Sequence, residues 1–105
     1  MLNADDILLS RVEFDDFSTK IFEGALRGVE VKDRRNPREL TFLVSKNTYD
    51  LYVGALASRM GDKADSFLLS MVGAVTYAGA SVVFDEEIPD GMVEVYGPQN
   101  KGLFA

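Results

Sequence analysis

The chain of 105 residues contains neither cysteine nor histidine. Without cysteine it has no disulfide framework and no thiolate nucleophile, and without histidine it lacks the commonest general base and the commonest transition-metal ligand. Its serines are not part of a Gly-x-Ser-x-Gly elbow, and its glycines do not form a phosphate-binding loop between a strand and a helix. We therefore expect no enzyme, no bound cofactor and no catalytic or metal-ligating residue.

Long hydrophobic runs are missing as well, since no apolar stretch approaches the roughly 20 residues that span a bilayer. The first residues have neither the basic region nor the apolar region of a signal peptide. Together with the lack of cysteine, these absences predict a soluble intracellular protein that has no membrane partner.

Basic side chains are scarce: 11 Lys and Arg stand against 17 Asp and Glu, which gives a net charge of −6. The chain as a whole therefore repels nucleic-acid phosphate, and we expect no direct binding to nucleic acid. Hydrophobic residues make up 47% of the sequence, too many for intrinsic disorder. A chain of this length builds one core, so residues 1–105 are predicted to form a single domain.

The residue pattern predicts the element order strand, helix, strand, helix, strands. The predicted strands cover residues 7–14, 40–44, 80–84 and 92–96, and the predicted helices run from Asp15 or Asp16 to Arg27 and from Ser45 to Met60. Each helix starts at a residue suited to N-capping and ends before a glycine, Gly28 or Gly61. Residues 62–71 fit a short helix or an ordered loop. This order predicts an α+β fold in which two main helices flank a small mixed β-sheet.

Apolar side chains at helical spacing predict which side of each helix meets the core. They are Phe17, Ile21, Phe22, Ala25 and Leu26 in the first helix, and Tyr49, Tyr52, Val53, Leu56 and Met60 in the second. The run from Leu40 to Val44 is typical of a buried strand, and Phe42 lies at its centre.

A basic loop lies between the first helix and the buried strand, and its basic residues are Lys32, Arg34, Arg35 and Arg38. Clustered arginines suit nucleic-acid phosphate. The segments on both sides are acidic, however, which favours contact between this loop and the acidic face of a neighbouring copy. A plain solvated loop is a third interpretation, and all three stay open at this point.

Four carboxylates, Asp85, Glu86, Glu87 and Asp90, gather around the turn at Pro89 and Gly91. Several carboxylates can bind a hard cation or share a proton. Their spacing matches no calcium-binding loop, so a solvated turn is the favoured interpretation.

Two segments carry a family resemblance. Residues 40–52 form a buried strand that runs directly into a capped helix, and residues 75–97 place a glycine before a valine-rich strand, a Pro-Asp-Gly turn and a last strand. Preceded by a helix and a variable loop, these segments resemble the axial domain of tailed-phage major capsid proteins, which have the Hong Kong 97-type capsid fold also found in encapsulins. The resemblance covers roughly residues 3–100 and rests on element order and on Gly79, Pro89 and Gly91.

The resemblance implies a structural protein of the virion, whose axial domains pack around the five-fold and six-fold axes of capsomers. A full subunit of this family also has an N-terminal arm, an extended loop and a peripheral domain, so the chain corresponds to the axial domain alone. The implied partners are copies of itself, weakly bound in isolation, and the implied location is the virion capsid or the cytoplasm of an infected bacterium. The alternative is a small acidic phage-encoded interaction protein or inhibitor whose carboxylates imitate nucleic-acid phosphate.

Overall fold

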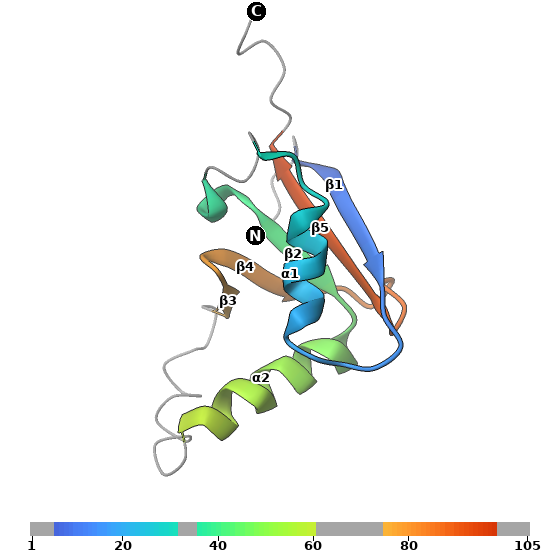
Figure 1. Ribbon diagram of the computed structural model, residues 1–105. Coiled ribbons are helices and arrows are strands. Elements are labelled where there is room, and N and C mark those ends of the chain that lie inside the picture. Colours follow the sequence, from blue (N-terminus) through green and yellow to red (C-terminus); the bar gives the residue numbers. More distant parts are fainter. Residues whose placement is uncertain (1–5, 32–35, 61–74, 99–105) are drawn as a thin grey trace, which may run out of the picture.

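The computed structural model describes residues 6–31, 36–60 and 75–98, which form a five-stranded mixed sheet and two α-helices (Figure 1). The strands are β1 (Asp6–Glu13), β2 (Thr41–Val44), β3 (Thr76–Tyr77), β4 (Ala80–Phe84) and β5 (Met92–Pro98). The helices are α1 (Lys20–Arg27) and α2 (Lys46–Met60), and a short 3₁₀ turn, η2 (Pro37–Glu39), precedes β2. The predicted α+β class is confirmed, and the four predicted strands are present with small shifts at their ends. Within the described ranges no helix has the length and apolar character needed to cross a membrane.

The strand order in the sheet is β1-β5-β2-β4-β3. β2 and β4 are parallel, and every other neighbouring pair is antiparallel. Only a turn separates β4 from β5 along the chain, yet β2 lies between them in the sheet. Because β2 and β4 are joined through α2 as a parallel crossover, their carboxyl ends meet at the same end of the sheet.

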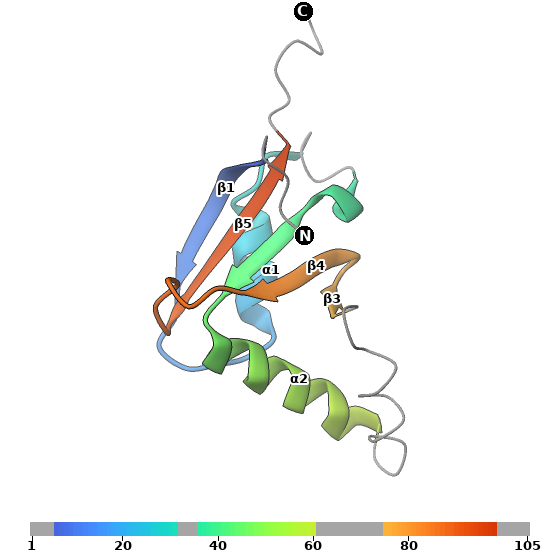
Figure 2. The same cartoon turned by 180° about the vertical axis from the view of Figure 1, so that it is seen from behind.

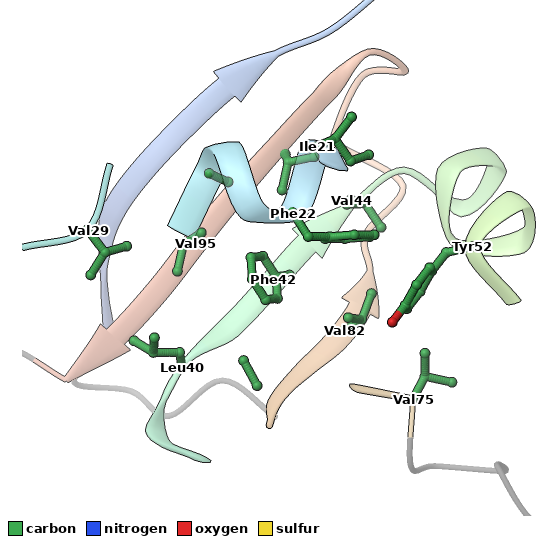
Figure 3. Packing of buried hydrophobic residues seen from close by; sticks show 13 residues of the cluster. Ile21, Phe22, Val29, Leu40, Phe42, Val44, Tyr52, Val75, Val82 and Val95 are labelled. Atoms are coloured by element: carbon green, nitrogen blue, oxygen red, sulfur yellow. The ribbon is translucent and has the colours of Figure 1, made fainter. Parts of the chain in front are cut away.

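The core lies on the face of the sheet that α1 covers (Figure 1). Phe22 of α1 and Phe42 of β2 are completely buried and meet edge to face, with ring centroids 5.1 Å apart. Tyr52 of α2 adds a third ring, 4.7 Å from that of Phe22 (Figure 3). Both helices therefore bury aromatic side chains on the same face, whereas Figure 2 shows the strands from their other side, in front of α1.

The predicted apolar stripes do face this core. The residues with buried side chains are Ile21, Phe22, Ala25 and Tyr52, and those packed against the core while partly exposed are Phe17, Leu26, Tyr49, Val53 and Leu56. Three further predictions lie outside the described residues. They concern the side chain of Met60, the helix end at Gly61 and the short helix or loop at 62–71.

The link between β2 and α2 confirms the predicted cap. The Ser45 hydroxyl oxygen accepts a hydrogen bond from the Thr48 backbone N–H at 3.1 Å. The Ser45 hydroxyl in turn donates to the Thr48 hydroxyl oxygen at 3.0 Å, so this buried hydroxyl has a partner both as donor and as acceptor. Ser45 thus satisfies one of the free N–H groups at the start of α2, and the strand passes into the helix without a loop.

The predicted start of the first helix at Asp15 or Asp16 is wrong, because α1 begins at Lys20. The backbone N–H of Phe14 donates to the Gly91 carbonyl at 2.8 Å, which keeps the chain on the sheet beyond β1. Residues 15–19 are then needed to carry the chain from the sheet edge to its face. Asp15 and Asp16 are exposed and lie before the helix rather than at its cap.

Candidate functional site

Of the four predicted basic residues, Arg38 lies within the described part of the chain. It is exposed on η2, between Pro37 and Glu39. The Asn36 side-chain amide donates to the Glu39 carboxylate at 2.9 Å, and the Leu40 N–H donates to the Pro37 carbonyl, so this turn is held by its own bonds. The other three basic residues, Lys32, Arg34 and Arg35, fall in the range 32–35, outside the described residues, and the sequence places them directly before this turn.

The acidic turn between β4 and β5 is anchored to the sheet by its backbone. The Asp85 N–H donates to the Val44 carbonyl at 2.9 Å, and the Asp85 carboxylate accepts the Glu87 N–H at 2.8 Å. Asp85 therefore shapes the turn, while its neighbours Glu86, Glu87 and Asp90 are exposed. Among the residues placed in the structure, no group of three or more acidic side chains is arranged to hold a metal ion.

The turn η2, which carries Arg38, and the acidic turn lie at opposite ends of the sheet. η2 precedes the amino end of β2, and the acidic turn follows the carboxyl end of β4, which runs parallel to β2 (Figure 2). Asp15 and Asp16 directly follow Phe14, which is bonded to Gly91, so they join the acidic end. We call η2 with its exposed Arg38 the basic end, and the acidic end consists of Asp15, Asp16, Asp85, Glu86, Glu87 and Asp90.

A buried ionic cluster lies on the sheet face away from the core, and no residue pattern predicted it. Glu94 of β5 has a side chain that is 5% exposed, and its carboxylate accepts a hydrogen bond from Arg11 Nε of β1 at 2.8 Å. The Tyr96 hydroxyl donates to the other carboxylate oxygen at 3.0 Å. Burial, together with this bond to Glu94, raises the pKa of the Tyr96 phenol. Both oxygens of the buried carboxylate are thus bonded, as a buried charge requires.

A shallow groove of about 280 Å³ lies along the outer side of α1. Its walls are Lys20, Glu23, Gly24 and Arg27. Arg27 and Glu23 form an exposed ion pair at 3.0 Å one helical turn apart, an arrangement that contributes little energy. Two of the charged side chains in the groove, Glu23 and Arg27, already pair with each other along α1, and we assign no chemistry to the groove.

Comparison of the chain with protein-family models finds no match, and comparisons with curated proteins and with solved structures find no significant one.

Proposed function

We propose that this chain is a structural, self-associating domain, the axial-domain portion of a phage major capsid protein. The element order that carries the resemblance is supported by a five-stranded mixed sheet with two helices. The direct passage from β2 into the Ser45-capped α2 agrees with the same resemblance. In this proposal the chain works by contacts between copies around a capsomer axis, without catalysis.

The position of Arg38 and of the acidic turn at opposite ends of the sheet is the observation that carries the proposal, and in the sequence Lys32, Arg34 and Arg35 directly precede the turn of Arg38. A basic end and an acidic end on opposite sides of one domain are complementary only between different copies. Such a head-to-tail contact is heterologous, which means that it joins two different surface patches of the same protein. Repeated contacts of this kind generate a ring when the rotation from one copy to the next adds up to a full circle. A capsomer is a ring of this kind, so the charge pattern fits the proposed role.

The contact is expected to be weak in the isolated chain. Charges at the rim of an interface are screened over a Debye length of about 10 Å at 0.1 M salt. A stable interface buries roughly 1,200 Å² or more, and the two charged ends are small turns and loops. We therefore expect association that rises with protein concentration and falls with salt.

Sedimentation of paired charge-reversal variants tests the proposal. The basic-end variant carries Arg34→Glu, Arg35→Glu and Arg38→Glu, and the acidic-end variant carries Glu86→Lys, Glu87→Lys and Asp90→Lys. Asp85 is left unchanged because its carboxylate holds the turn. Each variant alone is expected to associate less than the parent at low salt, while an equal mixture of the two regains the association of the parent.

A control variant with Lys20→Glu, Arg27→Glu and Arg59→Glu makes the same change in net charge on the exposed sides of the helices. It is expected to associate as the parent does. A parent that remains monomeric at high concentration and low salt, or a basic-end variant that associates as well as the parent, would overturn the proposal. Genes for a portal, a protease and tail proteins beside this gene would support the capsid assignment independently.

The acidic end also favours a second candidate, the acidic interaction protein whose carboxylates imitate nucleic-acid phosphate. It gathers Asp15, Asp16 and the carboxylates of the turn 85–90 at one end of the sheet. Under this alternative the parent stays monomeric, and the basic-end variant sediments as the parent does. Salt-sensitive binding of random DNA to the parent in the same buffers would instead indicate a nucleic-acid contact at the basic end.

A further inference from the structure

β1 forms an outer edge of the sheet, and no element in the described ranges pairs with its free side (Figure 1). It is eight residues long and contains neither proline nor lysine, two residues that commonly protect edge strands. Its register with β5 shifts between Leu8 and Ser10, so one irregularity interrupts it. From Ser10 to Glu13 the strand is regular and is able to accept another strand.

The hydrogen-bond pattern shows which backbone groups of this regular part are free for pairing. The Phe14 N–H donates to the Gly91 carbonyl, so Phe14 directs its backbone groups towards β5. Bonding positions alternate along an antiparallel strand. Val12 therefore also bonds towards β5, while Arg11 and Glu13 direct their N–H and C=O groups to the free edge.

The side chains of the same two residues carry opposite charges on one face. Arg11 lies opposite Glu94 and Glu13 lies opposite Met92, so both stand on the face away from the core. Both are exposed. Arg11 has five N–H donors and is held at its inner side by Glu94, which orients it and leaves donors for a second carboxylate.

We propose that β1 pairs with β1 of a second copy, antiparallel, about a two-fold axis that passes through Val12. In this register Arg11 of each copy lies opposite Glu13 of the other, and these two pairs exchange backbone hydrogen bonds through the groups that face the free edge. The same pairs bring opposite charges together twice. Val12 lies opposite Val12 of the second copy, and the two five-stranded sheets join into one.

The register follows from charge and from the alternation of the backbone. A shift of the pairing by one residue would place backbone N–H and C=O groups that face the free edge opposite groups that face β5, so no hydrogen bonds would form between the copies. A register that pairs Glu13 with Asp6 would bring two negative charges together. The interface is small, below the roughly 1,200 Å² of stable complexes, so the dimer is expected to be weak. This pairing uses the backbone of β1 and the side chains of Arg11 and Glu13, which belong to neither the basic nor the acidic end, and it does not rest on the proposed function.

Cysteine trapping tests the register, and the chain has no cysteine to interfere. In a non-hydrogen-bonded antiparallel pair the Cα atoms are about 4.5 Å apart, within the range of a disulfide. Val12→Cys should therefore form a disulfide dimer under mild oxidation. The control is Leu8→Cys, since Leu8 is 41% exposed, more than Val12, but lies four residues from the axis.

Random collision would cross-link the more exposed Leu8→Cys faster, whereas the proposed pairing reverses this order. We expect Val12→Cys to dimerise at least about tenfold faster, because pairing raises the effective concentration of the second thiol. Equal rates, or a faster Leu8→Cys, would overturn the proposal.

Charge reversal gives an independent readout. Adding Glu13→Lys to Val12→Cys places a lysine opposite Arg11 of the second copy at both ends of the ladder and should reduce the rate to that of Leu8→Cys. Adding Glu23→Lys, which makes the same charge change on the exposed side of α1, should leave the rate unchanged. A Val12→Cys dimer that forms equally fast with either change would show that Arg11 and Glu13 do not direct the pairing. Because Glu13 and Glu23 belong to neither the basic end nor the acidic end, a failure here is distinguishable from a failure of the proposed capsomer contact.

Discussion

Arg11 and Glu94 are 83 positions apart in the sequence, and their side chains meet across β1 and β5 with an Arg11 Nε to Glu94 Oε2 distance of 2.8 Å. Glu94 is buried while the Arg11 side chain is 52% exposed, so the arginine covers the carboxylate from the solvent side. Tyr96 completes the set of bonds to Glu94. The cluster ties the first strand to the last.

Removing the arginine should leave a buried carboxylate without its charge partner. We expect Arg11→Ala to lower the free energy of unfolding by about 1–3 kcal/mol, less than for a fully buried pair because Arg11 is half-exposed. Arg27→Ala, which breaks the exposed pair with Glu23, should cost under about 0.5 kcal/mol. Urea unfolding of both variants measures this, and the combination Arg11→Met with Glu94→Leu should recover most of the loss. Equal effects of Arg11→Ala and Arg27→Ala would contradict the interpretation.

Phe42 lies at the centre of the core, completely buried and edge to face with Phe22. Phe42→Ala should lower the free energy of unfolding by about 3–5 kcal/mol, because it removes a large side chain and leaves a cavity. Phe84→Ala is the matched control, since Phe84 lies on β4 but is 43% exposed. Chemical denaturation of the two variants is the measurement. A loss below about 1 kcal/mol for Phe42→Ala would show that β2 is not central to the core.

The hydroxyl of Tyr52 donates to the Thr76 carbonyl at 2.7 Å and joins α2 to β3. Burial raises the pKa of Tyr52 in the folded protein. Folding therefore favours the neutral phenol, so the stability from this group is complete below about pH 10 and is lost as the pH rises through the folded pKa.

The Tyr52→Phe variant should show a shallower loss of stability above pH 10 than the parent. At neutral pH it should be less stable by about 1 kcal/mol, because the Thr76 carbonyl loses its donor. Urea midpoints from pH 7 to pH 11 provide the test, with Tyr49→Phe as a control for the loss of another phenol from α2. Parallel curves for the parent and Tyr52→Phe would rule out this role of the phenol.

The turn between β3 and β4 holds a non-glycine residue in a left-handed conformation. Ala78 has φ of 51° and Gly79 has φ of 88°, the pair of positive angles that a type I′ two-residue hairpin turn requires. Alanine is strained there, whereas asparagine before glycine is preferred. We expect Ala78→Asn to raise the free energy of unfolding by about 1 kcal/mol.

The opposite change at the next position is the control. Gly79→Ala should destabilise the protein, because its φ is unfavourable for alanine and the new Cβ would lie 3.3 Å from Pro37 Cβ. Thermal unfolding ranks the two variants and the parent. An Ala78→Asn variant no more stable than the parent would show that the turn is not strained.

Features set by neighbouring residues were predictable from the sequence. Ser45 caps α2 because a hydroxyl three residues before a free N–H reaches it within one turn, whatever the rest of the chain does. The apolar spacing in α1 placed Ile21, Phe22 and Ala25 on one buried side for the same local reason. The mixed α+β class followed from the order of such segments.

Features set by contacts between distant residues were decided by the tertiary structure. The start of α1 moved to Lys20 because the Phe14 N–H bonds to Gly91, far along the chain, and no local signal at Asp15 or Asp16 reports that bond. The parallel pairing of β2 with β4 set Arg38 on η2 and the acidic turn at opposite ends of the sheet. Nothing beside Arg11 or Glu94 in the sequence distinguishes them from exposed charged residues. The pairing of β1 with β5 brings the two side chains together and buries the carboxylate. Propensity and capping act within one helical turn or a few strand residues, whereas strand order and buried charge depend on which segments close the sheet.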